Sequence, residues 1–291
     1  MASERVNKAT FFYSIFLPTF LIILFLTIYP VFSVLFNSFF KYNFLADVKP
    51  FIGFTNFIDI LKEDLFQRAF LNTIIFSFAA TAIEVTAGIF LALLFYGRFR
   101  GKKTTMITVI FPMMISTMVI CAIWKTMYHY EIGIINYLIT SMGFDPIGWL
   151  TDQSMALFSV IIVDVWQWTP FAFLIVQAGL NSIPGELFEQ ASIDGASYTY
   201  TLRKITFPLL SGQILLVFLL RTIDTFRIFD KVYALTQGGP GNSTETVSYY
   251  IYREGFSYFN LGRASAASLI TLVVISFIAV GYIRNILGEK Q

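Results

Sequence analysis

Six apolar stretches separated by polar segments dominate the pattern along the chain. Each is long enough to cross the hydrocarbon core of a bilayer, about 30 Å thick, which requires about 20 helical residues. The expected spans cover residues 12–37, 70–96, 104–128, 154–180, 209–233 and 261–285. The first is too long for the apolar core of a signal peptide, and no small-residue cleavage site follows it, so we expect a true span. The pattern therefore predicts an all-α polytopic membrane protein with six transmembrane helices.

The composition agrees with this prediction. Hydrophobic residues make up 56% of the chain and charged residues only 13%, far outside the range of soluble domains. With one cysteine, Cys121, and one histidine, His129, an intrachain disulfide is impossible, and the usual zinc clusters and a Ser-His-Asp triad are disfavoured. The net charge of +2 is too small to suggest a nucleic-acid partner. We expect residues 1–11 to precede a single transmembrane domain, residues 12–291, without a metal site or catalytic residues.

A polar segment between two spans, residues 181–208, has a regular pattern of its own, and we call it the elbow. Three apolar side chains fall on one helical face in its first half: Leu187, Phe188 and Ala191. Asp194-Gly195 is expected to end this helix, because glycine readily adopts the left-handed conformation found at helix ends. A second short helix is expected from Tyr198 to Pro208. The elbow is therefore predicted to be two short helices joined at a glycine, outside the membrane.

The elbow resembles the cytoplasmic loop of binding-protein-dependent ABC importer permeases. That family's pattern is Glu-Ala-Ala, three residues, Gly, nine residues, Ile, one residue and Leu-Pro. The matching residues here are Glu189-Gln190-Ala191, Gly195, Ile205 and Phe207-Pro208, at the same spacings. Gln190 and Phe207 are mild departures from the pattern. The resemblance implies the type I ABC importer permease fold with a cytoplasmic coupling-helix loop.

The same resemblance implies that the elbow docks in a groove of a separate ATPase subunit. In that arrangement Glu189 pairs with a basic residue of the ATPase, and Gly195 permits the turn. The alternative is a surface helix hairpin without a partner. The residues implied in ATPase coupling are Leu187, Phe188, Glu189, Gln190, Ala191, Asp194 and Gly195.

The distribution of basic residues predicts the orientation in the membrane. An N-terminus on the inside gives ten inner and eight outer Lys and Arg, and the densest cluster, Arg98–Lys103, then lies on a short inner loop. The elbow and both termini are therefore expected to be cytoplasmic. Residues 97–102 look like a phosphate loop, but they lack one residue between the glycines, and Lys103 stands where Ser or Thr is required. We expect no ATPase in this chain, so that ATP and Mg²⁺ bind the partner subunits.

A turn motif follows the fifth span at Leu235-Thr236-Gln237-Gly238-Gly239-Pro240. Gly-Gly-Pro forces a sharp non-helical turn. The motif resembles the sugar-transporting branch of the importer permeases, the maltose and glycerol-3-phosphate type, and the likeness extends from about Phe51 to Arg284. By this resemblance Gly238, Gly239 and Pro240 contact an extracytoplasmic sugar-binding protein.

Ionisable residues inside spans are costly and are therefore functional candidates. On the fifth span four residues form one face at i, i+3, i+4 and i+7: Arg221, Asp224, Thr225 and Ile228. On the fourth span the same spacing joins Asp164, Gln167, Trp168 and Phe171. Carboxylates suit sugar hydroxyls, and an aromatic ring stacks on the apolar face of a pyranose, so both faces predict a sugar pathway. Alignment with the maltose-type permease implies the same residues and adds Met113 and Thr117 from the third span.

A structural interpretation of these residues stays open. Arg221–Asp224 and Arg227–Asp230 are also spaced as i, i+3 ion pairs that would pin the fifth span to another helix. Trp168 could be an interface anchor. We expect structural roles for Arg227, Asp230 and Glu84. Because neighbouring carboxylates neutralise Arg221, a neutral sugar is favoured over an anionic one.

The sequence is interpreted as a permease subunit of an ABC importer for a mono- or oligosaccharide or related polyol, in a bacterial or archaeal inner membrane. By resemblance it works by alternating access, with a second permease chain of different but related sequence, two ATPase subunits and the binding protein. The main alternative is an ion- or proton-coupled secondary transporter without an ATPase, which would predict inverted repeats that we do not find. A membrane scaffold would not need two polar faces, and a peptide or amino-acid permease should lack the Gly-Gly-Pro turn.

Overall fold

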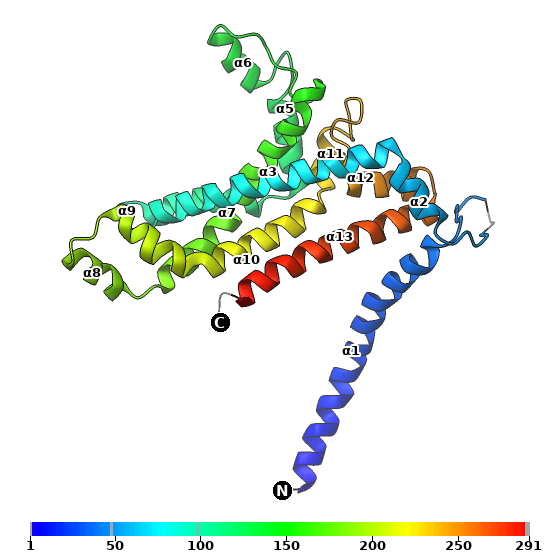
Figure 1. Cartoon of the computed structure of the whole chain (residues 1–291), viewed down its shortest axis with the longest axis horizontal. Helices are drawn as coiled ribbons and strands as arrows, with labels where there is room; N and C mark the ends of the chain where they lie inside the picture. Colours follow the sequence, from blue (N-terminus) through cyan, green and yellow to red (C-terminus); the bar gives the residue numbers. More distant parts are fainter. Residues whose placement is uncertain (1, 47–48, 98, 289–291) are drawn as a thin grey trace. The chain divides into compact units, whose positions relative to one another are not determined.

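The computed structural model describes residues 2–46, 49–97 and 99–288, and their regular elements are helical (Figure 1). Met1, Arg98 of the predicted basic cluster and residues 289–291 lie outside the described residues. The helices are α1 (Ala2–Ser38), α2 (Thr55–Lys62), α3 (Asp64–Leu94), α4 (Lys102–Met114), α5 (Thr117–Met127), α6 (Ile134–Ser141), α7 (Gln153–Ser182), α8 (Gly185–Ile193), α9 (Tyr198–Thr201), α10 (Phe207–Phe226), α11 (Asp230–Leu235), α12 (Val247–Tyr252) and α13 (Leu261–Gly288), with two π-helical turns, η1 (Leu202–Thr206) and η2 (Arg253–Ser257).

Among the described residues, five helices are long and apolar enough to cross a membrane: α1, α3, α7, the helix through α10, and α13. The bent pair α4 and α5 makes six if it counts as one span. This confirms the expectation of an all-α polytopic membrane protein. The chain divides into two compact units, a smaller one (Met1–Lys62 with Ile251–Leu272) and a larger one (Glu63–Tyr250 with Val273–Gln291). The single domain over residues 12–291 stays a prediction.

The smaller unit is tied together by amide side chains near the end of α1. Buried Asn56 donates hydrogen bonds to the carbonyl oxygens of Ser38 and Phe40, at 2.8 and 2.9 Å. Asn43 Nδ2 donates to Asn260 Oδ1 at 2.8 Å. The bond to Ser38 O satisfies a carbonyl group that the end of α1 leaves open, and the three bonds together fix the loop that follows α1.

The core of the larger unit lies where α3 and α10 pack against α7. Gly88 on α3 permits a close approach, because a Cβ there would stand 2.6 Å from the Cβ of Ala172 and 2.8 Å from the backbone nitrogen of Phe173. Small residues at such crossings are typical of helices packed in membranes. Asp152 caps the start of α7 by accepting hydrogen bonds from the Ser154 amide and hydroxyl at 2.7 and 2.6 Å, which lowers the pKa of Asp152.

The predicted third span, residues 104–128, is not one straight helix. Helices α4 and α5 meet at 97° across Ile115 and Ser116, whose backbones are extended. Pro112 lies in the last turn of α4, where its ring and missing N–H weaken the helix. Gln167 on α7 donates hydrogen bonds to Ile115 O at 3.4 Å and to Thr117 Oγ1 at 3.1 Å, so it braces the break.

The predicted fifth span, residues 209–233, is also interrupted. The helix stops at Phe226, residues 227–229 are not helical, and α11 begins at Asp230. At its other end the helix is longer than expected, since α9, η1 and α10 form one continuous helix, Tyr198–Phe226. The wide turn η1, in which the Phe207 N–H donates to Leu202 O, carries the helix through Pro208. The predicted separate second helix of the elbow is therefore wrong.

Candidate functional site

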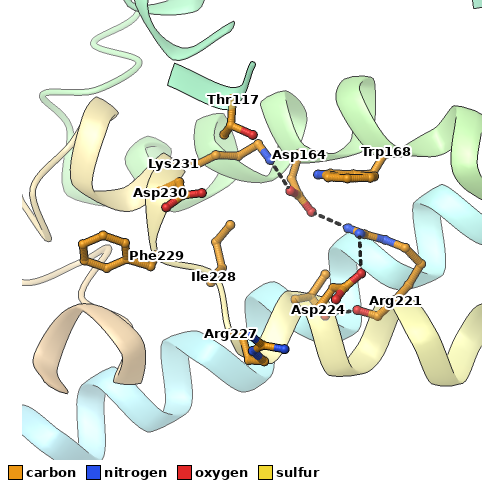
Figure 2. Close-up of a pocket in the computed structure, with 11 residues that line it drawn as sticks. Thr117, Asp164, Trp168, Arg221, Asp224, Arg227, Ile228, Phe229, Asp230 and Lys231 are labelled. Atoms are coloured by element: carbon orange, nitrogen blue, oxygen red, sulfur yellow. Dashed lines mark hydrogen bonds and ion pairs between the residues drawn. The ribbon is translucent and has the colours of Figure 1, made fainter. Parts of the chain in front are cut away.

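A cavity of about 380 Å³ opens in the larger unit where α10 ends (Figure 2). Helices α5 and α7 provide one side of it, and the segment from the last turns of α10 into α11 provides the other. The lining residues are Thr117, Asp164, Trp168, Arg221, Asp224, Thr225, Arg227, Ile228, Phe229, Asp230 and Lys231. Six of these eleven are ionisable, three cationic and three acidic, which is unusual for a membrane protein core.

The buried ionisable side chains at the cavity form one connected network with Glu84. Arg221 Nε donates to Glu84 Oε2 at 2.5 Å, and Arg221 Nη2 donates to Glu84 Oε1 and to Asp164 Oδ2, both at 3.0 Å. Lys231 Nζ donates to Asp164 Oδ1 at 2.7 Å. All four side chains are at most 2% exposed. Two cations therefore face two carboxylates across α3, α7, α10 and α11, the pairing that buried charges require.

The remaining charged side chains that line the cavity are exposed. Asp224 Oδ2 lies 3.5 Å from Arg221 Nη1, but its side chain is 55% exposed and so remains open to a ligand. Arg227 and Asp230 are exposed on the two sides of the helix break. Trp168 lies beside both buried cations, with the Arg221 guanidinium carbon 5.1 Å and Lys231 Nζ 6.0 Å from its ring centroid. The cavity thus combines an aromatic ring with accessible acceptors and donors.

The structure brings most of the predicted pathway residues together. Those that line the cavity are Thr117, Asp164, Trp168, Arg221, Asp224, Thr225 and Ile228. Gln167, Phe171 and Met113 do not line it. Gln167 braces the α4–α5 break instead, and the Phe171 ring packs edge-on to Trp168 at 6.3 Å.

Three details of the sequence interpretation need correction. Ile228 does not extend the helical face of Arg221, because it lies in the break after Phe226. For the same reason Arg227 and Asp230 do not share a helix as an i, i+3 pair. Lys231 lies within the predicted fifth span, 209–233, but was not expected to line the pathway; it is buried and paired with Asp164. The available signal was a lysine inside a predicted apolar span, where an unpaired charge is costly.

Thr225 links the cavity wall to α3 rather than presenting a free hydroxyl. Its Oγ1 lies 2.6 Å from Ser77 Oγ and 3.3 Å from Thr81 Oγ1, and it also donates to Arg221 O at 2.8 Å. The contact joins the last turns of α10 to the middle of α3 beside the charge network. Thr225 is therefore a bracing residue at the edge of the cavity.

The elbow forms a second site at the opposite end of the larger unit from α11 (Figure 1). Helix α8 ends at Ile193, so Asp194-Gly195 terminates it as predicted; the φ of Gly195 is +71°, and the Ala196 and Gly195 amides donate to Ala191 O and Ser192 O, respectively. This is the Schellman arrangement, which favours glycine. A hollow of about 610 Å³ lies between α8 and the start of the long helix, lined by Leu187, Gln190, Ala191, Asp194, Gly195, Ala196, Ser197, Tyr200 and Ile205.

The coupling residues implied by the elbow pattern divide into two groups. Leu187 and Phe188 are half-buried against the core of the larger unit, and the Phe188 ring packs at a tilt against Tyr96, with 5.4 Å between the ring centroids. Glu189, Gln190 and Asp194 are exposed. Ile193 was not among the expected residues, yet it is 84% exposed at the end of α8.

The Gly-Gly-Pro turn is folded against its own unit. Gly238 is buried, with a φ of +81°, and a Cβ there would stand 2.9 Å from the Tyr249 ring. The Thr244 hydroxyl lies 2.7 Å from both Gly239 O and Thr236 Oγ1. The exposed tip is instead Gly241-Asn242, beside Arg68 and Gln153 in a hollow of about 380 Å³.

The family to which the chain belongs follows from its sequence. Residues 84–287 match the family described as "Binding-protein-dependent transport system inner membrane component". The chain belongs to this family. It is therefore a multi-pass, inner-membrane transport subunit, and the expectation of an ABC importer permease is confirmed.

Particular relatives support the same class. The trehalose/maltose transport system permease protein MalF of Thermococcus litoralis is 34% identical over 283 residues, which cover 96% of this chain and 95% of the relative. The probable ABC transporter permease protein y4oQ of Sinorhizobium fredii is 39% identical over 227 residues, 78% of this chain and 73% of the relative. A crystal structure of a bacterial ABC transporter involved in import of the acidic polysaccharide alginate has a chain with the same fold, at a TM-score of 0.87 and 23% identity, covering 100% of this chain and 99% of that one.

Proposed function

We infer that this permease imports a carbohydrate, and that the cavity at the end of α10 is where the sugar passes. The observation that carries the inference is the cavity's composition. Trp168 offers a ring for stacking, and the accessible carboxylates Asp224 and Asp230 offer acceptors for hydroxyl groups. The similarity to a permease named for trehalose and maltose supports a sugar or related polyol as the cargo.

The charge balance of the cavity favours a neutral sugar. Its three cationic residues, Arg221, Arg227 and Lys231, face three lining carboxylates, Asp164, Asp224 and Asp230, and Glu84 adds a fourth carboxylate paired with Arg221. Arg221 and Lys231 are already paired with buried carboxylates, so neither is available to bind an anion. Hydroxyl groups, which both donate and accept, suit this balanced lining.

The elbow is the proposed docking site for the ATPase. Exposed Glu189, Gln190 and Asp194, together with Ile193, form the surface of α8 that a partner groove would receive. Two ATPase subunits would bind ATP and Mg²⁺, so this chain would need no cofactor of its own. With the bent pair α4 and α5 counted as one span, the elbow and both termini would then lie in the cytoplasm.

The importer also requires partners on its outer side and within the membrane. A solute-binding protein would deliver sugar at the turn that contains Gly238, Gly239 and Pro240, and the exposed tip Gly241-Asn242 offers a contact surface there. A second permease chain, different but related, would complete the pathway. Alternating access would then follow from ATP binding and hydrolysis.

The test is sugar uptake into proteoliposomes that contain the complete complex, with maltose and trehalose as probes. Uptake is expected to require ATP, and Glu189→Ala should lower uptake per ATP hydrolysed, because it removes a charge from the docking surface. Ser192→Ala on the same helix is the control and should behave as wild type. Uptake driven by a proton or sodium gradient and indifferent to Glu189→Ala would instead establish the secondary transporter.

A further inference from the structure

Glu84 is the only member of the buried charge network that does not line the cavity. It lies in the middle of α3, is 0% exposed, and directs both carboxylate oxygens at the Arg221 guanidinium. Such a bidentate pair fixes the plane and the position of the guanidinium. Glu84 therefore holds Arg221 from behind, on the side away from the cavity.

The network is electrically balanced only when Glu84 is counted. Arg221 and Lys231 contribute two positive charges, and Asp164 supplies one of the two negative charges that match them. Asp224 is too exposed and, at 3.5 Å, too distant to replace a buried carboxylate. Without the charge of Glu84, a buried positive charge beside the cavity would be compensated only in part, by the exposed carboxylate of Asp224, and the cavity would attract an anionic ligand.

We propose that Glu84 is a positioning residue that sets the charge selectivity of the cavity. By neutralising Arg221 and holding it back, Glu84 makes the site reject acidic sugars although two buried cations lie at its wall. The proposal rests on the proposed function, since it assumes that sugars occupy the cavity. Glu84 touches no substrate in this proposal, yet it decides whether the cavity accepts a neutral sugar or an acidic one, a uronate.

The experiment measures binding of maltose and of trigalacturonate, a neutral and an acidic probe, to the purified complete complex in the absence of binding protein. Saturation-transfer difference NMR detects such weak binding directly. Wild type is expected to bind maltose and not trigalacturonate. Glu84→Gln keeps the size of the side chain but removes its charge, and it should bind trigalacturonate about tenfold more tightly than wild type, as expected for one unit charge near the ligand.

Two further variants separate charge from mere disruption. Glu84→Gln/Arg221→Gln removes both charges and should lose the gain in trigalacturonate binding. Glu84→Asp keeps the charge, but its shorter side chain holds Arg221 less closely, so trigalacturonate affinity should rise about threefold. If Glu84→Gln does not assemble, the Glu84→Asp variant decides, because an unchanged trigalacturonate affinity there overturns the proposal.

The outcomes also distinguish this proposal from the proposed function. A Glu84→Gln complex that assembles, binds maltose and still rejects trigalacturonate overturns the role of Glu84 but leaves carbohydrate import intact. A wild-type complex that does not bind maltose, while Glu84→Gln gains trigalacturonate, overturns maltose as the cargo but supports Glu84 as the charge determinant. A gain that persists in the double variant would also contradict the proposal.

Discussion

Asp164 is the residue on which the buried charges converge. One carboxylate oxygen accepts from Arg221 at 3.0 Å and the other from Lys231 at 2.7 Å, so the side chain joins α10 and α11 to α7. A buried ion pair is not in itself strong support for stability, because desolvation offsets its attraction. Removal of one member is costly, however, since it leaves a charge without a partner.

Asp164→Asn should therefore destabilise the protein by about 3–5 kcal/mol, because it leaves two buried cations facing one carboxylate. Thermal unfolding of the detergent-purified complex measures the loss. The matched control is Asp224→Asn, which removes a carboxylate that is 55% exposed and should change stability by about 1 kcal/mol or less. Equal effects of the two substitutions would show that Asp164 does not carry the network.

At this scale the sequence identifies candidates but not their partners. Glu84, Asp164 and Arg221 attract attention because ionisable side chains are rare within apolar runs. Their pairing is invisible to periodicity, since Glu84 lies 137 residues and Asp164 57 residues from Arg221. Lys231 was missed because its burial depends on a helix break that the sequence pattern does not reveal.

At the scale of elements, the fold depends on how closely the long helices approach. Gly88 is the contact point of α3 with α7. Gly212 on α10 is a contrasting case, because a Cβ there would meet nothing within 4 Å. The two helical glycines therefore differ in what an added methyl group would encounter.

Gly88→Ala should lower stability by about 1–3 kcal/mol, since its methyl group would overlap the Ala172 side chain and the Phe173 backbone. Gly212→Ala should be neutral or should raise stability by about 0.5–1 kcal/mol, because it removes the conformational freedom of glycine from a helix. Thermal unfolding of the two variants in parallel makes the comparison. Similar melting temperatures would contradict a close α3–α7 contact at Gly88.

Helix existence was predictable from apolar run length, whereas helix breaks were not. Residues 154–180 fall within α7, and residues 261–285 fall within α13. The breaks consist of Ile115-Ser116 in one span and Arg227-Ile228-Phe229 in the other, so each holds only one polar residue and does not end the apolar run clearly. What holds these breaks open is tertiary, such as the hydrogen bond from Gln167 to Ile115 O.

At the scale of the whole molecule, one helix connects the two candidate sites. The continuous helix Tyr198–Phe226 begins at the elbow and carries Arg221 near its other end. At 1.5 Å per residue, Tyr198 and Arg221 are roughly 35 Å apart along the helix axis. A movement imposed on the elbow by an ATPase would therefore reach the cavity through this helix if it behaves as a rigid rod.

Gly212→Pro tests this connection, because proline in a helix interior removes a hydrogen bond and forces a kink or a break. The variant should assemble with the ATPase and hydrolyse ATP, while sugar uptake per ATP falls by about tenfold or more. Gly212→Ala, which keeps the helix intact, should transport as wild type. Size-exclusion chromatography of the complex confirms that assembly is retained, and uptake and hydrolysis are measured in the same proteoliposomes. Undiminished uptake by an assembled Gly212→Pro complex would show that the elbow communicates with the cavity by another route, and the α3–α7 contact would then be the next element to substitute.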